Sequence, residues 1–211
     1  MLMDIYKYGY PHQCDKCKDL LHIKLKLPKP YHNKVTSNKR VMLIGQDPYI
    51  YRDPDRVGCV LMLNEERGAL RRWLKDVLGE TIFQEVELYA TNVVKCPVKR
   101  DSSISLKGIL SLLQPCFNNC KGYLITEIAN FRPTIALTFG EPAHKLLTSI
   151  LDNRDSVRDS MKEAFTGKFV NASVRNASFQ YSPCLHIKTY RVAETYGDQV
   201  KKFQHNLQSI L

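Results

Sequence analysis

The sequence lacks the features that would place it in a membrane or in a secretory pathway. It has no run of 18 or more apolar residues, so it offers no candidate membrane span. Its first residues, MLMDIYKYGYPHQC, do not join a basic segment to an apolar run, as secretion signals do. It also has no internal repeat and no low-complexity tract. We therefore expect one cytoplasmic domain over residues 1–211, monomeric and without membrane contact.

Acidic residues are comparatively few, with 21 Asp and Glu against 31 Lys and Arg, and the formal net charge is +10. An excess of this size favours a polyanionic partner, and nucleic acid is the commonest. The positive charge does not form one long block. It is spread through segments such as KLKLPKPYHNK and LHIKTYR, where basic, aromatic and apolar residues alternate. Such mixtures suit a folded surface that holds phosphates and offers rings to bases.

Short apolar runs alternate with helical patterns along the chain. We expect strands over 40–45, 86–92, 133–140 and 177–182, and helices over 64–79, 105–131 with a division near Pro115, 141–151 and 191–211. Strands that alternate with helices indicate a parallel sheet covered on both faces. The predicted fold class is therefore α/β, a three-layer α/β/α sandwich with a central, mainly parallel four-stranded sheet.

The first expected strand, RVMLIG, ends in a turn that contains a glycine, an amide, a carboxylate, a proline and a tyrosine. Ligands of open α/β sheets bind at the carboxyl ends of the strands. The turns GQDPY, TNVVKCP and FGEP follow three of the expected strands and should lie along one edge. Taken by itself, GQDPY also suits a tight turn in which Asp47 caps a helix.

Seven cysteines are present, and a disulfide framework is disfavoured in a reducing compartment. The spacing of CDKC lets two thiolates bind one metal centre, although a redox pair has the same spacing. A four-thiolate set can be assembled from Cys14, Cys17, Cys96 and Cys120. Cys116 is an alternative for the last position. Such a set fits a [4Fe–4S] cluster or structural zinc, whereas burial in the core accounts for Cys59 and Cys184.

Taken together, these motifs resemble the uracil-DNA glycosylase family. GQDPY resembles the water-activating motif of the classical branch, and TNVVKCP resembles the second motif of the iron–sulfur branch, family 4. CDKC and CKGYLITEIANFRPTIALTFGEPAHKLL are similar to the cysteine-bearing segments of that branch, which usually has GEAPG in place of GQDPY. The resemblance covers the chain from Cys14 to Arg191 and implies the uracil-DNA glycosylase fold with a [4Fe–4S] cluster.

The resemblance also implies an activity, the hydrolysis of the N-glycosidic bond of uracil in DNA after base flipping, which leaves an abasic site. Asp47 matches the carboxylate that stabilises the sugar cation and orients water. Asn92 matches the amide that reads O4 and N3–H of uracil. Tyr49 matches the ring that excludes the methyl group of thymine, and Gln46 matches a position whose backbone contacts the base.

One departure from the family pattern concerns the floor of the base pocket. The family places a phenylalanine after the position of Gly58, where its ring stacks on uracil. Leu61 is nearest to that place in this chain, and Val60 is its neighbour. An apolar floor is therefore expected, without stacking worth about 1–3 kcal/mol per base. Tyr51 is a candidate to supply a compensating ring.

The second departure concerns the histidine that donates to the uracil oxygen. YSPCLHIKTYR stands where the family has its His-Pro-Ser motif and its DNA-wedging loop. One alignment places Ser182 at the histidine position, another places Gln180 there, and His186 follows three residues after the proline. The loss of one such donor typically lowers a rate by about 10²–10³.

The same segment supplies the expected DNA contacts. Leu185 is the candidate for filling the gap left by the flipped base, and Lys188 and Arg191 are candidates for phosphate contacts. The missing histidine and phenylalanine also leave two other functions open. One is a catalytically weak or inactive relative that binds DNA or another protein. The other is a glycosylase for another deaminated base, such as hypoxanthine.

Overall fold

The fold is taken from a computed structural model of the 211-residue chain. The structure describes residues 6–20, 22–48, 58–101, 103–185 and 193–211. No helix in these parts of the chain combines the length and the apolar character needed to cross a lipid bilayer.

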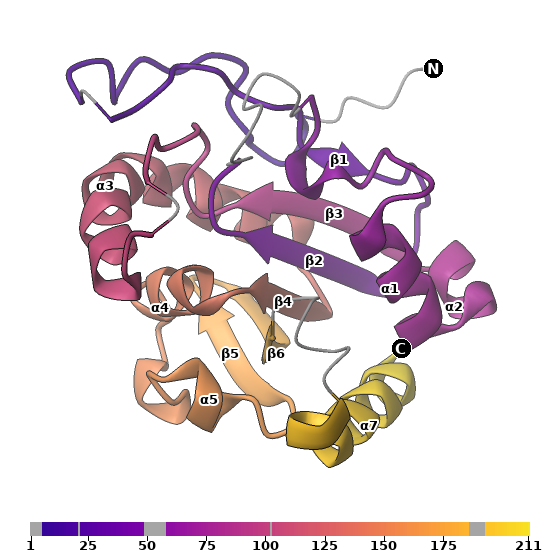
Figure 1. The fold of residues 1–211 in the computed structure, drawn as a ribbon. Helices are drawn as coiled ribbons and strands as arrows, with labels where there is room; N and C mark the ends of the chain where they lie inside the picture. Colours follow the sequence, from indigo (N-terminus) through magenta and orange to yellow (C-terminus); the bar gives the residue numbers. More distant parts are fainter. Residues whose placement is uncertain (1–5, 21, 49–57, 102, 186–192) are drawn as a thin grey trace.

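A six-stranded sheet of order β1-β3-β2-β4-β6-β5 forms the centre of the molecule (Figure 1). The strands are β1 Tyr31–His32, β2 Arg40–Gly45, β3 Glu87–Asn92, β4 Ile135–Phe139, β5 Val170–Val174 and β6 Ala177–Cys184. The four inner strands are parallel to one another, and β1 and β5 pair antiparallel at the two edges. The mainly parallel sheet is confirmed, with two edge strands that the sequence did not predict. β1 has two residues and β5 buries only two side chains, so neither produces a clear pattern.

Helices cover both faces of the sheet, which confirms the three-layer architecture (Figure 1). The helices are α1 Ala69–Leu78, α2 Glu80–Glu85, α3 Leu106–Phe131, α4 Glu141–Thr148, α5 Met161–Ala164 and α7 Ala193–Ile210, with short 3-10 turns at Val60–Met62 and Arg154–Ser156. Successive side chains of a strand point to opposite faces. Met42 and Ile44 of β2 therefore pack with α3 and α4, whereas Val41 and Leu43 pack with α1 and α7.

The expected division of the long helix at Pro115 is wrong, because α3 continues through this residue. A proline inside a helix removes one backbone hydrogen bond and usually kinks or ends the helix. Pro115 lies on the exposed side of α3, and Ser111, whose carbonyl loses its partner, is exposed as well. Water can therefore bind that carbonyl, while Cys116 and Phe117 keep the opposite side of the helix buried in the core.

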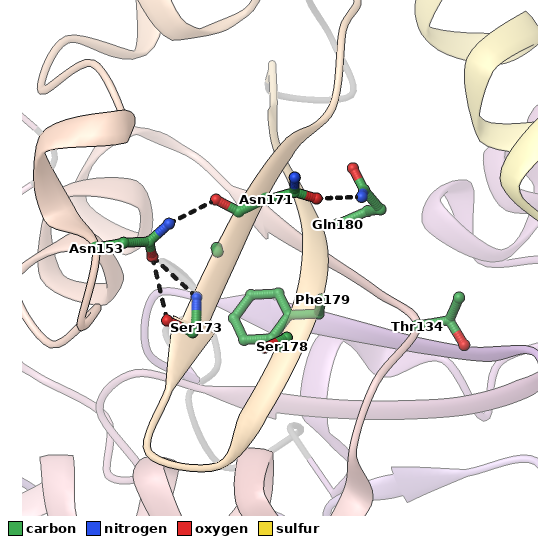
Figure 2. Close-up of a pocket in the computed structure, with 8 residues that line it drawn as sticks. Thr134, Asn153, Asn171, Ser173, Ser178, Phe179 and Gln180 are labelled. Atoms are coloured by element: carbon green, nitrogen blue, oxygen red, sulfur yellow. Dashed lines mark hydrogen bonds between the residues drawn. The ribbon is translucent and has the colours of Figure 1, made fainter.

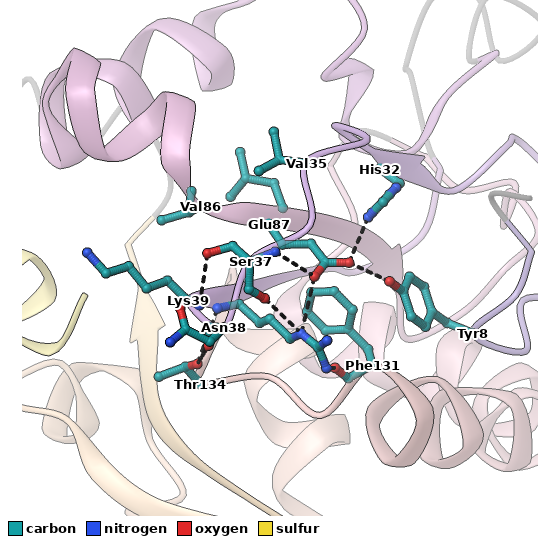
Figure 3. Close-up of polar contacts among 12 residues, drawn as sticks. Tyr8, His32, Val35, Ser37, Asn38, Lys39, Val86, Glu87, Phe131 and Thr134 are labelled. Atoms are coloured by element: carbon teal, nitrogen blue, oxygen red, sulfur yellow. Dashed lines mark hydrogen bonds and ion pairs between the residues drawn. The ribbon is translucent and has the colours of Figure 1, made fainter. Parts of the chain in front are cut away.

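A buried carboxylate joins several segments at the amino end of β3 (Figure 3). Glu87 accepts hydrogen bonds from the Tyr8 hydroxyl at 2.5 Å and from Arg40 Nε at 3.1 Å, and His32 Nε2 lies 3.0 Å from it. Burial alone would raise the pKa of Glu87, but the hydrogen bonds from Tyr8 and His32 and the charge of Arg40 together lower it. This cluster attaches the N-terminal segment and β1 to the amino end of β3. The turns GQDPY and TNVVKCP follow the opposite, carboxyl ends of β2 and β3.

The buried side chain of His144 makes the free energy of unfolding depend on pH. Nδ1 of His144 lies 2.6 Å from the Tyr181 hydroxyl, and Nε2 lies 2.8 Å from the carbonyl oxygen of Arg158. Burial lowers the pKa of His144, so the unfolded chain binds a proton at a pH where the folded protein does not. The stabilisation is therefore present above the unfolded pKa of about 6.5 and is lost as the pH falls.

We expect the free energy of unfolding, measured with urea, to decrease as the pH is lowered from about 7 to about 5. His144→Gln should make this decrease smaller, whatever its stability at neutral pH. Burial also lowers the pKa of His32, so part of the pH dependence should remain in the variant. An unchanged slope in His144→Gln would contradict the assignment.

Candidate active site

The carboxyl ends of β2 and β3 bring together the first two predicted turns. Gly45, the last residue of β2, pairs with Asn92, the last residue of β3. Figure 1 shows the arrowheads of these two parallel strands at the same edge of the sheet. Gln46 and Asp47 follow Gly45 directly. The predicted convergence of GQDPY and TNVVKCP at one edge is therefore observed for the part of the first turn that the structure describes.

The amide of Asn92 is buried and unpaired. The residue is 1% exposed, and within the described part of the chain neither Nδ2 nor Oδ1 has a hydrogen-bond partner. Leaving a buried polar group unpaired costs about 1–3 kcal/mol, so such groups are rare in folded proteins. The amide presents a donor and an acceptor in one plane. This is the arrangement expected of a side chain whose partner is a ligand.

Gly45 and Leu61 lie against this amide. A Cβ atom added to Gly45 would stand 2.3 Å from Asn92 Oδ1 and 2.7 Å from Leu61 Cδ2. Only glycine therefore fits at this position while the two neighbouring side chains remain in place. Leu61 itself has a left-handed backbone conformation, with φ of 55°, which is unfavourable for leucine by about 1–2 kcal/mol. The predicted floor residue thus lies beside the predicted base-reading residue.

The carboxylate of Asp47 is buried and fully hydrogen-bonded. Its Oδ2 accepts from Arg100 Nη1 at 2.8 Å and from the backbone N–H of Val98 at 3.1 Å. Its Oδ1 accepts from Arg100 Nη2 at 2.9 Å and from Gln46 Nε2 at 2.9 Å. The side chain of Asp47 is 0% exposed and that of Arg100 is 9% exposed. This bidentate ion pair fastens the turn after β2 to the segment after β3.

A buried ion pair contacts the backbone of Asn92 and was not predicted from the sequence. Nζ of Lys95 donates to the carbonyl oxygen of Asn92 at 2.8 Å and to Thr91 Oγ1 at 2.6 Å, and it pairs with Glu127 of α3. Tyr89 donates to the same carboxylate at 2.7 Å. Lys95 therefore fixes the end of β3. The available signal was a lysine surrounded by apolar residues in TNVVKC.

Five cysteines from three chain segments lie close together. Burial raises the pKa of Cys96 to about 12, and the neighbouring thiols add to this shift. Those neighbours are Cys14, Cys17, Cys116 and Cys120. Nδ2 of Asn119 in α3 donates to Cys17 Sγ at 3.3 Å, so the CDKC segment lies against this helix. Three of the predicted thiols, Cys14, Cys17 and Cys120, therefore lie near Cys96, and so does Cys116, the alternative for the last position.

The donor chemistry of these thiols fits the two groups predicted from the sequence, a [4Fe–4S] cluster and a structural zinc ion. Among the described residues, no three or more His, Cys, Asp or Glu side chains are arranged around one common metal position. The identity of a bound group stays a prediction.

The candidates on β6 lie apart from Asn92. Ser182 pairs with Leu137, two residues before the edge, and its Oγ donates to the carbonyl oxygen of Pro183 at 3.2 Å. Leu185 is 5% exposed and packs in the core with α1 and α7. Tyr49, Tyr51, His186, Lys188 and Arg191 lie outside the described residues, so their roles stay predictions.

Gln180 lies earlier on β6, two residues before Ser182, at a polar hollow of about 500 Å³ (Figure 2). Nε2 of Gln180 donates to Asn171 Oδ1 at 2.5 Å, and Nδ2 of Asn153 donates to the carbonyl oxygen of Asn171 at 2.8 Å. Gln180 pairs with Ile135, the first residue of β4, so the hollow lies toward the amino ends of the parallel strands. It takes no part in the site at the carboxyl edge.

The fold and the site define a class of protein, an α/β sandwich with a buried, unpaired amide and a buried carboxylate at the carboxyl edge of its sheet, as seen in the described residues. The family model described as the uracil DNA glycosylase superfamily matches residues 32–204, and the chain belongs to this superfamily. Membership indicates a DNA glycosylase, a hydrolase of DNA repair that acts on DNA. The comparison with curated proteins returns no match. The resemblance inferred from the motifs is confirmed for the superfamily, and the CDKC pair precedes the matched residues.

Proposed function

We propose that the protein removes uracil from DNA by hydrolysing the N-glycosidic bond after the nucleotide has been flipped out of the helix. The observation that carries this proposal is the buried, unpaired amide of Asn92. Uracil presents an acceptor at O4 beside a donor at N3–H, which complements the two ends of an amide. Cytosine presents the opposite pattern at these positions. A buried site that leaves its polar groups unpaired with the wrong base discriminates strongly against that base.

The proposal is tested by measuring base release from oligonucleotides that contain uracil, hypoxanthine, thymine or cytosine, as single strands and as duplexes. We expect release of uracil only. Release of hypoxanthine without uracil would favour the glycosylase for another deaminated base. The absence of any release, with DNA binding retained, would favour the inactive relative. Ser182 and Gln180 lie away from Asn92, and this observation favours the inactive relative as the second candidate function.

We further propose that Asp47 stabilises the developing sugar cation, while Gln46, Leu61 and Tyr49 contact the base. A donor to the leaving base would come from His186 or Ser182, and phosphate contacts from Lys188 and Arg191. Leu185 would have to leave the core in order to enter the DNA. All hydrogen-bonding capacity of Asp47 in the described structure is used by Arg100, Val98 and Gln46. A water molecule positioned by Asp47 would have to replace one of these partners.

A comparison of Asp47→Asn with Arg100→Gln separates a catalytic role of Asp47 from its structural role in the ion pair with Arg100. Each variant breaks the ion pair, and each should lower stability to a similar degree, because a buried charge loses its partner. If Asp47 acts on the sugar, Asp47→Asn should release uracil from single strands about 10² times more slowly than Arg100→Gln does. Rates are measured at a temperature at which both variants are folded, as shown by their urea transitions. Equal loss in the two variants would reduce Asp47 to a structural role.

We also propose that Cys14, Cys17, Cys96 and Cys120 hold a [4Fe–4S] cluster, which would join the N-terminal segment to α3. The four thiols lie close together, with Cys116 beside them. Iron and sulfide analysis of the purified protein, together with its visible absorbance, tests this proposal. Cys120→Ser should lose iron, whereas Cys116→Ser should retain it. Zinc in a colourless protein would instead favour the structural zinc site.

The remaining proposals concern the state of the protein in the cell. We propose a monomer in the cytoplasm, with DNA as its partner. Light scattering of the purified protein at several concentrations tests the first point, and a mass near 24.3 kDa is expected. Fractionation of cells that express the full chain tests the second.

A further inference from the structure

The guanidinium of Arg100 occupies the carboxylate that the proposed reaction needs. Its Nη1 and Nη2 form two parallel hydrogen bonds to Asp47, of 2.8 and 2.9 Å, and Nη1 also donates to the carbonyl oxygen of Val98 at 3.2 Å. The side chain of Asp47 is 0% exposed while this pair is formed. In the described structure the carboxylate is therefore closed to water and to a sugar. If Asp47 acts on DNA, binding of the substrate has to open the pair.

Arg100 lies where the chain leaves the core after β3. Residues 91–98 are all buried, whereas Lys99 is exposed and Arg100 is half-buried. Lys99 donates its backbone N–H to the carbonyl oxygen of His22 at 2.6 Å, which holds the backbone beside Arg100 in place. An arginine side chain is long, and its charged head tends to reach solvent. The guanidinium can therefore turn away from Asp47 while the backbone that carries it remains anchored.

The flipped nucleotide brings a second anion to the same place. Its sugar carries the glycosidic bond at C1′ and phosphodiesters at O3′ and O5′, so a carboxylate beside C1′ is separated from two phosphates by one sugar. The planar fork of a guanidinium binds phosphate as well as carboxylate, with two parallel N–H···O bonds. The neighbouring carboxylate, Asp101, accepts hydrogen bonds from Ser103 within its own turn. Arg100 can therefore bind a phosphate of the nucleotide on which Asp47 acts.

We propose that Arg100 exchanges Asp47 for a phosphodiester of the flipped deoxyuridine, so that the carboxylate is freed only by a nucleotide that belongs to a strand. This inference rests on the proposed function, because it gives Asp47 its role at the sugar. A buried carboxylate that has lost its guanidinium lacks a counter-charge, and the developing sugar cation supplies one in the transition state. Phosphate binding thereby accelerates the reaction instead of tightening the binding of the ground state.

The test removes the charge of the phosphate without changing the base or the sugar. Single strands contain one deoxyuridine with normal phosphodiesters or with a neutral methylphosphonate on its 5′ side, its 3′ side or both. We expect the wild type, at saturating protein, to release uracil about tenfold more slowly when the linkage that Arg100 binds is neutral. Arg100→Gln should be slower on the normal strand, and its rates on the different linkages should agree within about twofold.

Three results would overturn the exchange. One is a wild type whose rate is the same on all linkages, and another is an Arg100→Gln variant that keeps the wild-type ratio of rates. The third is a neutral linkage that weakens binding and leaves the rate at saturation unchanged, which is the behaviour of an ordinary phosphate contact.

Two further variants complete the comparison. Arg154→Gln is the matched control, because Nη2 of Arg154 lies 3.6 Å from Asp159 in an exposed pair. It should keep the wild-type ratio of rates. Arg100→Lys retains a cation beside Asp47 but cannot form two parallel hydrogen bonds. Its ratio should lie between those of the wild type and Arg100→Gln, and it serves as the test variant if Arg100→Gln does not fold.

A measurement without catalysis separates this inference from the proposed function. Strands with 2′-fluoro-deoxyuridine, which resists cleavage, are added to protein labelled with ¹⁵N in its arginine side chains. The NMR signal that is absent from Arg100→Lys belongs to Arg100. It should move when the normal strand is bound and stay in place when the neutral strand is bound. If the wild type releases no base but this signal moves, the proposed function fails and the exchange stands. If uracil is released and the signal stays in place with both strands, the exchange fails and the proposed function stands.

Discussion

Replacing Asn92 by leucine should remove most base release while leaving the protein at least as stable as the wild type. The variant deletes the donor and the acceptor that complement uracil, and losing one such contact in a transition state lowers a rate by about 10²–10³. The same atoms are buried without partners among the described residues. Removing them should raise the free energy of unfolding by about 1 kcal/mol or more. Stability is read from urea transitions, and activity from single-turnover release of uracil.

Asn33→Leu is the matched control, because it removes an amide that is paired. Nδ2 of Asn33 donates to the carbonyl oxygen of Val86 at 2.8 Å, and its Oδ1 accepts from the backbone N–H of Leu88 at 3.0 Å. This variant should lose stability and keep its rate per folded molecule. If Asn92→Leu instead keeps or gains stability and loses activity, the amide of Asn92 serves binding at a cost in stability. Uracil release by Asn92→Leu within about threefold of wild type would contradict that role.

Lys95→Met should be the most destabilising of the single substitutions discussed. It leaves the Glu127 carboxylate in the core without its cation, and breaking a buried pair in this way costs about 3–5 kcal/mol. Since domains of this kind are stable by about 5–15 kcal/mol, a large part of the total would be lost. The end of β3 would also lose the hydrogen bond to the carbonyl oxygen of Asn92. Urea unfolding at neutral pH measures the effect.

A second substitution distinguishes a buried charge from a packing defect. In Lys95→Met with Glu127→Gln, no charge remains, and Tyr89 keeps a hydrogen-bond acceptor. The double variant should recover part of the lost stability, which appears as a coupling energy in the double-mutant cycle. Lys75→Met is the surface control, because its pair with Glu80 is exposed and worth about 0–1 kcal/mol. A double variant that is no more stable than Lys95→Met would contradict the account.

The sequence by itself determined the parts of the protein that depend on local pattern. A branched apolar run marked β2, which was predicted with the bounds that the structure has, and the other three inner strands were predicted from shorter apolar segments. Because parallel strands end at the same edge of a sheet, the turns after β2 and β3 were expected to meet, and Gly45 pairs with Asn92 there. The order of motifs also indicated the superfamily to which the chain belongs. Edge strands of two to five residues carried too little pattern to be predicted.

The tertiary structure decided which side chains face one another. Sequence order gives no sign that Arg100 binds Asp47, that Lys95 pairs with Glu127 across the core, or that Ser182 lies two residues below the edge. The course of α3 was also decided by packing, since the buried face of the helix outweighs the one hydrogen bond lost at Pro115, which lies on the exposed side. Strand patterns arise from short runs of neighbouring residues, whereas these pairings join residues far apart in the chain. Only the folded arrangement of the strands and helices brings such residues within a few ångström of each other.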